Sequence, residues 1–177
     1  KITLEKIFKQ APKGYHQLSS NFPFLSYQQS SLKKAVGSTL LAYMSTSGIY
    51  MFPTGEANIN THNVLYEAPF VCSHEMAHQL GYASETEANF IAFVVASEAN
   101  DPYLKYSMLL QMFSYAQDAQ LLLLAGTKGF DAWKKQIAKN KALLSPDVLK
   151  DRAIIRAFFV ARAGKQIQAS NELYDQF

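Results

Sequence analysis

Two histidines and a glutamate at one-turn spacing are the residues of this chain best suited to chemistry. His74-Glu75-Met76-Ala77-His78 matches the pattern HExxH. At about 3.6 residues per helical turn, His74 and His78 lie one above the other on one face, where both imidazoles can bind one metal ion. Glu75 projects about 100° from that row, where it can act on water at the metal without occupying a coordination position. The pattern predicts two ligands and a general base.

The residues around this pattern favour a metal site over a coincidental match. Between positions 71 and 80 the only charged side chain besides the histidines is that of Glu75, and proline is absent. A surface helix would normally carry solvating charges there. The alternative is that the histidines are hydrogen-bonded residues of a helix face and that Glu75 is merely solvated. A catalytic zinc takes three protein ligands and keeps one position open, so a third ligand is expected elsewhere.

The segment directly downstream is where we expect that third ligand. Gly81 is a plausible helix stop, and Ser84 can cap the helix that follows it. Ser84 and Glu87 fit the capping box S-x-x-E, which gives Glu87 a structural role. Glu85 has no such role and shares a helix face with Asn89, which can hydrogen-bond a ligating imidazole. We predict Glu85 as the third ligand, with Glu87 as the alternative.

This set of ligands predicts zinc (Zn²⁺) as the cofactor and hydrolysis of an amide bond as the reaction. Two imidazoles suit zinc and its transition-metal neighbours better than magnesium or calcium. Zinc held by His74, His78 and Glu85 would polarise a carbonyl and activate water. Glu75 would take the proton of that water and deliver it to the leaving amine. The expected partner is therefore a peptide or protein substrate.

The same residues resemble known metallopeptidase families. HEMAH followed by ETEAN at residues 85–89 resembles the gluzincin arrangement, in which HExxH precedes a ligand Glu in an ExxxD motif. This resemblance implies that Glu85 is the ligand and puts Asn89 where the Asp would stand. Only six residues separate the second histidine from Glu85, far fewer than in thermolysin-like enzymes. HEMAHQLG also resembles the start of the metzincin motif HExxHxxGxxH, whose last His would fall at Ser84.

The stretch from Gly48 to Phe93 resembles a bacterial family of unknown function more closely still. Its members look like membrane-anchored zinc peptidases, with transmembrane helices ahead of a soluble HExxH domain. The resemblance implies a protease-like site and attachment to the membrane only through a segment absent from this chain, with this domain outside the bilayer. No apolar run here reaches the roughly 18 residues of a span, and the chain begins at Lys1 instead of Met, as expected of an excised piece.

Length and composition predict one compact domain over residues 1–177. This length is usual for a domain. The net charge of +3 comes from scattered Lys and Arg, which is too weak a bias to predict nucleic-acid binding. Cys72 is the only cysteine, so it cannot form an intramolecular disulfide, and we expect it in the core. The fold class expected is α+β, mainly helical and zincin-like, with a small β-sheet before the HExxH helix.

Apolar spacing and turn residues predict the elements ahead of the HExxH helix. A short helix is expected around residues 4–9, ended by a Pro-Lys-Gly turn at 12–14. Apolar residues spaced by four in 32–44 suit a helix, although a strand is possible. Residues 48–52 and 57–60 read as two strands of a hairpin. An edge strand beside the metal pairs with extended substrate in zinc peptidases, and this hairpin is our candidate for that edge.

The remaining chain is expected to be helical. Asp101-Pro102 and Ser145-Pro146 each combine an N-cap residue with proline at the first helical position. The expected helices run from there to about Leu124 and toward Lys165, the latter continuing in pieces to Phe177, with a shorter helix around Trp133 between them.

Several other residues could serve such a site. Glu56 could bind the amino end of a substrate, although a solvated turn carboxylate is the simpler expectation. His62 could donate a hydrogen bond to the transition state, although an exposed loop histidine is simpler. The oxyanion donor would come from the helical part, where the eligible residues are Tyr103, Tyr106, Arg152, Arg156 and Tyr174.

Two other classes of function compete with a peptidase. One is a catalytically inactive zinc-binding module that serves interactions of a membrane-anchored protein. The other is a purely structural helical domain in which the HEMAH pattern is coincidental. Metal analysis separates the structural domain from the other two, and a peptide-library assay separates the enzyme from the module.

Overall fold

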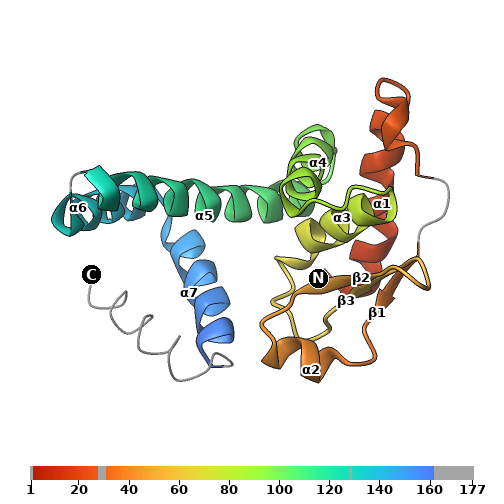
Figure 1. Cartoon of the computed structure of the whole chain (residues 1–177), viewed down its shortest axis with the longest axis horizontal. Coiled ribbons are helices and arrows are strands. Elements are labelled where there is room, and N and C mark those ends of the chain that lie inside the picture. Colours follow the sequence, from red (N-terminus) through yellow and green to blue (C-terminus); the bar gives the residue numbers. More distant parts are fainter. Residues whose placement is uncertain (1, 28–30, 128, 162–177) are drawn as a thin grey trace. The chain divides into compact units, whose positions relative to one another are not determined.

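The computed structural model describes residues 2–27, 31–127 and 129–161. The chain forms two compact units, Lys1–Leu109 and Leu110–Phe177, which are described separately. The described part is mainly helical, with one sheet of three strands (Figure 1). This confirms the mixed, mostly helical fold with a small sheet, whereas the single domain stays a prediction.

Helix α1 (Leu4–Ser19) opens the first unit and continues past the turn expected at Pro12, so that expectation is wrong. Proline inside a helix costs a hydrogen bond, but burial of one helix face outweighs this cost. Gly14 belongs to that face, since a Cβ there would lie 2.7 Å from Cγ1 of Val95. The glycine permits close packing against a second helix instead of ending the first. The buried face consists of Ile7, Ala11, Gly14, Tyr15 and Leu18.

The sheet follows α1 and the short 3-10 helix η1 (Pro23–Leu25). Its strands are β1 (Leu32–Lys34), β2 (Gly48–Met51) and β3 (Glu56–Ile59), in the order β1-β3-β2. β2 and β3 pair antiparallel, which confirms the predicted hairpin, and β1 pairs parallel with β3. The segment predicted as helix or strand contains both, since helix α2 (Ser38–Tyr43) follows β1.

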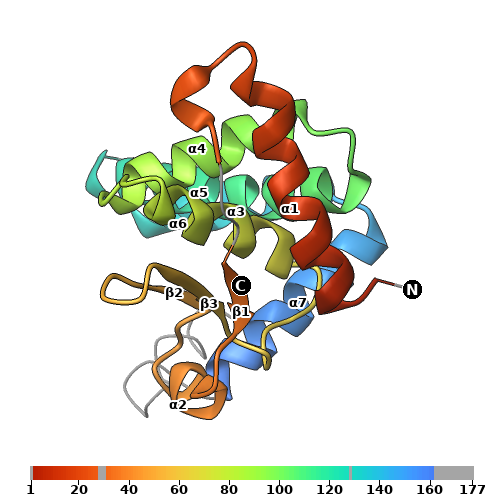
Figure 2. The ribbon, with the colours of Figure 1, turned by 90° about the vertical axis from the view of Figure 1, so that its right-hand side faces the viewer.

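Helix α3 (Ala68–Gln79), which carries the HEMAH sequence, lies at the centre of the first unit. It contacts the sheet through β2 and β3, and it contacts α1 and α4 (Glu85–Glu98) away from the sheet (Figure 2). Cys72, Met76 and Ala77 of α3 are fully buried. Because α3 packs on several sides, its side chains can meet both the edge of the sheet and the start of α4.

The second unit is helical where it is described. α5 (Pro102–Thr127) begins in the first unit and continues into the second, followed by α6 (Phe130–Ala142) and α7 (Pro146–Val160). The predicted helices are confirmed over these residues, whereas the pieces expected beyond position 161 lie outside the described residues. No helix in the described part of the chain has both the length and the apolar character needed to cross a bilayer.

Candidate metal centre

Long-range hydrogen bonds hold α3 beside its ligand residues. The hydroxyl of Tyr15 in α1 donates to the carbonyl of Ser73, at 2.5 Å, one residue before His74. At the start of the helix, the Ser107 hydroxyl donates to the carbonyl of Glu67 and accepts from the amide of Phe70. Helices α1 and α5 thereby fix the position of α3 within the first unit.

The predicted ligands His74, His78 and Glu85 converge on one point. The Nε2 atoms of the two histidines are 3.1 Å apart, and Glu85 places one carboxylate oxygen 3.1 Å from His74 Nε2 and the other 3.5 Å from His78 Nε2. Both imidazoles are recessed, with 13% and 11% of the side chain exposed, whereas 77% of the Glu85 side chain is exposed. The carboxylate therefore faces the two recessed imidazoles from the solvent side.

The turn after α3 orients His78. Gly81 has φ of +99°, a left-handed conformation that glycine adopts without strain. The amide of Tyr82 bonds to the carbonyl of Ala77 and that of Gly81 bonds to the carbonyl of His78, which is a Schellman turn. This turn places the Tyr82 carbonyl oxygen 2.7 Å from Nδ1 of His78. Nδ1 must carry the proton to donate to a carbonyl, so Nε2 of neutral His78 presents its lone pair to the other ligands.

Burial keeps His74 in the neutral form that a metal requires. Desolvation lowers the pKa of His74 and the nearby His78 lowers it further, whereas the charge of Glu85 and a side-chain hydrogen bond with Asn89 act in the opposite direction. Asn89 therefore lies beside the first histidine, whereas the Nδ1 atom of His74 is buried without a hydrogen-bond partner in the structure. The lowered pKa of His74 favours the neutral imidazole, which can offer a nitrogen lone pair to a metal.

Glu75 lies apart from this cluster, against the sheet. The residue is only 5% exposed. A Cβ on Gly48 of β2 would lie 2.6 Å from Glu75 Oε1, so only glycine leaves room for the carboxyl group there. Burial and then the charge of Glu85 raise the pKa of Glu75 to about 8, while the backbone N–H of Tyr50 donates to the carboxyl group and opposes this. A buried carboxyl group with a raised pKa beside a cluster of donors is typical of acid-base catalysis.

The capping box expected at the start of α4 is not formed. Ser84 is at the N-cap position with an extended backbone, but its side chain makes no capping hydrogen bond. Both Ser84 and Glu87 are exposed, so water can satisfy the first amides of the helix. Glu87 is not part of the histidine cluster. Of the two carboxylates weighed as third ligand, the structure brings Glu85 alone to the histidines.

The two additional candidates near the sheet, Glu56 and His62, lie at the surface. Glu56 is the first residue of β3 instead of a turn residue, and it forms an ion pair with Lys33 of β1 at the surface. This ion pair lowers the pKa of Glu56. His62 is exposed in the loop after β3, as the simpler expectation had it. Cys72 is fully buried, and burial raises the pKa of its thiol, so its place in the core is confirmed.

Among the described residues, the contacts found for the candidate oxyanion donors do not involve His74, His78 or Glu85. Tyr106 packs edge-on against Tyr66, with ring centroids 6.5 Å apart. Arg152 belongs to the second unit, where it donates to Ser114 and stacks over a phenylalanine ring. Arg156 is also in that unit, and Tyr174 lies outside the described residues. Tyr103 lines a hollow of about 420 Å³ between α1 and the start of α5, which none of the three predicted ligands lines.

The structure adds three site residues to those predicted from the sequence. They are Gly48, which leaves room for Glu75; Tyr82, whose carbonyl orients His78; and Gln79, whose side chain reaches the sheet. The role of Tyr82 could have been predicted from the sequence. A Schellman turn after the predicted helix stop at Gly81 places the next residue against the last turn of the helix. Gly48 and Gln79 act through contacts between distant segments, which have no local signature.

Comparison with known proteins places the whole chain in one family. The family described as "Protein of unknown function (DUF3810)" matches residues 1–177, and the chain belongs to it. This agrees with the resemblance to a family of unknown function. No curated protein and no solved structure matches the chain.

Proposed function

We propose that this member of the DUF3810 family is a zinc-dependent, zincin-like metallopeptidase that hydrolyses peptide bonds. The observation that carries the proposal is the convergence of His74, His78 and Glu85 with all ligand atoms within 4.8 Å of one another. The buried carboxyl group of Glu75 lies beside this cluster but outside it. Such a division between ligands and base is what hydrolysis at a zinc ion requires.

The donor set fits zinc. Two recessed imidazole nitrogens and one carboxylate oxygen match the types and number of protein ligands in catalytic zinc sites. The hydrogen bond from His78 to the Tyr82 carbonyl is an outer interaction that zinc-binding histidines commonly make. When bound by these three residues, zinc supplies Lewis-acid polarisation of a carbonyl and lowers the pKa of water.

Glu75 is the group of this chain that moves protons in the proposed reaction. Water adds to the carbonyl carbon and loses a proton to the Glu75 carboxylate; that proton then passes to the leaving nitrogen as the C–N bond breaks. The Tyr50 amide, which donates to the carboxyl group, and the close approach of Gly48 keep Glu75 in place. The carboxyl group of Glu75 thus stays next to the cluster without taking the place of a metal ligand.

Strand β2 is the place that we propose for the substrate. It is an edge strand of the described sheet, and its Tyr50 amide contacts the base. An extended peptide that pairs with such an edge presents its backbone carbonyls in a regular row. Because Glu75 lies beside the same strand, a carbonyl of the paired peptide would fall near both the base and the cluster.

Membrane attachment of the longer protein belongs to the same proposal. It is supported only by the sequence resemblance to membrane-anchored zinc peptidases, with this domain outside the bilayer. Expression of the longer protein followed by membrane fractionation tests it. Release of that protein into the supernatant without detergent would contradict the attachment.

Zinc content and the Glu75→Gln variant test the activity. The purified chain should hold about one zinc after dialysis, and a broad peptide library should reveal cleavage. Glu75→Gln should fold and keep zinc, because an uncharged amide suits a buried site whose carboxyl pKa is raised to about 8. Its peptidase activity should fall by at least about 10²-fold. A chain without zinc would end the metallopeptidase proposal, and a chain that holds zinc but cleaves nothing would favour the inactive interaction module.

A further inference from the structure

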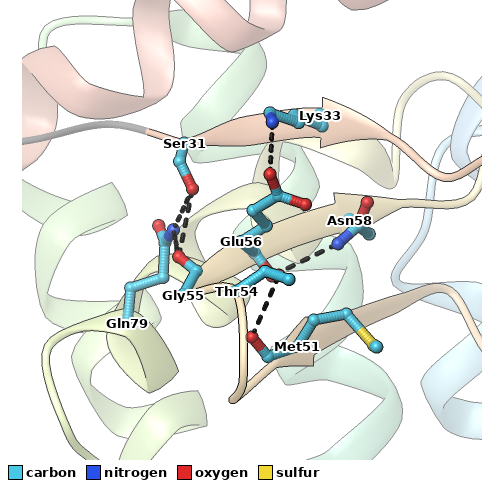
Figure 3. A network of polar contacts seen from close by, with 8 residues as sticks. All are labelled: Ser31, Lys33, Met51, Thr54, Gly55, Glu56, Asn58 and Gln79. Atoms are coloured by element: carbon cyan, nitrogen blue, oxygen red, sulfur yellow. Dashed lines mark hydrogen bonds and ion pairs between the residues drawn. The ribbon is translucent and has the colours of Figure 1, made fainter.

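Gln79, the last residue of α3, uses its amide group to hold three other segments. Its Nε2 donates to the hydroxyl of Ser31, at 2.9 Å, and to the carbonyl of Gly55, at 2.7 Å. Its Oε1 accepts from the hydroxyl of Tyr27. Figure 3 shows the side chain reaching from α3 to the start of β1 and to the turn between β2 and β3. Both donor positions and one acceptor position of the amide are occupied, so the side chain is fixed in orientation.

The group that Gln79 holds is the tip of the hairpin. The Gly55 carbonyl also accepts from the Ser31 hydroxyl, at 3.0 Å, and the Gly55 amide donates back to Met51, the last residue of β2, at 2.8 Å. The backbone carbonyl of Ser31 accepts from the amide of Ala57 in β3, at 3.1 Å. The side chain of Gln79 thereby fixes the position of the turn between β2 and β3 relative to α3.

The other end of β2 is held by the same face of α3. Gly48, at the start of the strand, lies against the Glu75 carboxyl group. Glu75 and Gln79 are four residues apart, so they point from one side of α3 on successive turns. The start of β2 therefore packs against Glu75, and the turn after β2 is hydrogen-bonded to Gln79. These two contacts place the strand relative to the helix that carries His74 and His78.

We propose that Gln79 is a positioning residue that fixes the edge strand β2 relative to the metal-binding histidines and so sets where an extended peptide lies. This inference rests on the proposed function. The contacts that orient the predicted ligands do not include Gln79, because His78 is oriented by the Tyr82 carbonyl and the residue before His74, Ser73, is held by the Tyr15 hydroxyl. Loss of the clamp should therefore weaken binding of extended ligands while zinc binding stays unchanged.

Two hydroxamates of different length separate this role from general stability. Both are bound to the zinc-loaded chain, one as acetohydroxamate and the other as a peptide hydroxamate long enough to pair with β2. In Gln79→Ala the peptide hydroxamate should bind about tenfold more weakly, which corresponds to a loss of about 1.4 kcal/mol in binding free energy. The affinity for acetohydroxamate should fall by less than about twofold. Gln79→Glu should show the same split, because a carboxylate cannot donate to the Gly55 carbonyl. Gln17→Ala, an exposed glutamine of α1, is the matched control.

Hydrogen exchange provides a readout that needs neither zinc nor activity. The amides of Gly55 and Ala57 should exchange faster in Gln79→Ala, whereas the amides in the middle of α3 should keep their protection. Ser31→Ala, which removes one acceptor of the clamp, should show a smaller change in the same direction and serves if the Gln79 variants fold poorly.

The outcomes distinguish a failure of the positioning role from a failure of the proposed function. Equal weakening of both hydroxamates, or unchanged exchange at the hairpin, would overturn the positioning role. Absence of zinc binding and of hydroxamate binding in the unmodified chain would end the proposed function, and the exchange rates would still decide whether Gln79 holds the hairpin. Faster exchange together with selective loss of the peptide hydroxamate supports both.

Discussion

The Nδ1 atom of His78 lies 2.7 Å from the carbonyl oxygen of Tyr82, four residues further along the chain. The carbonyl can only accept, so the ring must hold its proton on Nδ1 and turn Nε2 toward His74 and Glu85. The orientation comes from the Schellman turn that ends α3 at Gly81. The end of the helix and the tautomer of a candidate ligand are thus one structural feature.

Gly81→Ala should weaken zinc binding as well as the fold. Alanine at a φ of +99° is strained, at a cost of roughly 1–2 kcal/mol, and relief of the strain would move the Tyr82 carbonyl away from His78. Loss of such an outer partner lowers metal affinity by about 10–100-fold. Competition with a zinc chelator and thermal unfolding measure the two effects. Gly129→Ala, at a φ of +80° in the second unit, should destabilise without changing zinc affinity; equal zinc loss in both variants would refute the link.

Gly48→Ala should separate catalysis from metal binding. The added methyl group would lie 2.6 Å from Glu75 Oε1 and 2.9 Å from Cγ1 of Val71, so the carboxyl group must move. Zinc content should be unchanged, and the turnover number should fall about 10- to 100-fold, part of the contribution of a general base. Gly37→Ala, where a Cβ would contact nothing within 4 Å, is the control. Full activity in Gly48→Ala would contradict the assigned position of the base.

Glu85→Ala and Glu87→Ala should differ sharply in zinc affinity. Only Glu85 reaches the histidines, with carboxylate oxygens 3.1 and 3.5 Å from their Nε2 atoms. Its loss removes one of three ligands and should strip zinc during dialysis, whereas Glu87→Ala should retain zinc and change stability by less than about 0.5 kcal/mol, as is usual for exposed residues. Isothermal titration with zinc decides between them. Stronger loss in Glu87→Ala would reverse the assignment of the ligand.

Glu67→Gln should change how stability depends on pH. Burial raises the pKa of Glu67 from 4.5 to about 7, and Oε2 of this carboxyl group is a buried atom without a hydrogen-bond partner in the structure. The pKa is higher in the folded than in the unfolded chain, so its contribution to stability is fully present below pH 4.5 and is lost as the pH rises through 7. The loss is on the order of 1–3 kcal/mol.

Urea unfolding of Glu67→Gln between pH 4.5 and pH 8 measures this effect. The variant should gain stability relative to the unmodified chain as the pH rises, because the amide stays uncharged. Glu98→Gln, at an exposed position at the end of α4, should follow the unmodified chain throughout. A constant difference between Glu67→Gln and the unmodified chain would show that Glu67 titrates normally.

The candidate ligands could be placed from the sequence because local geometry determines them. Two histidines at i and i+4 share a face in any helix. The short connection through Gly81 leaves the next helix little freedom, so Glu85 at its start returns to that face. Caps with proline at the first helical position placed the starts of α5 and α7 correctly for the same reason, since they act within a few residues.

Tertiary packing decided the features that local rules miss. Pro12 and Gly14 read as a helix stop, yet α1 continues, because its buried face packs on Val95 of α4 and the missing Cβ permits the contact. The expected cap by Ser84 is absent, since the start of α4 is exposed and water can replace it. Local preference is worth a few tenths to a few kcal/mol, which packing or solvent can outweigh.

The surroundings of the base were also decided by tertiary structure. Gly48 and Glu75 are 27 positions apart, and Gln79 and Gly55 are 24 positions apart. Whether such residues meet depends on how the hairpin lies across α3, which is set by the whole packed unit. The sequence by itself determined which residues could bind a metal and move a proton, because that follows from side-chain chemistry and helical spacing. Only the tertiary structure decided what holds the base and the edge strand beside them, because these contacts join segments that no local rule connects.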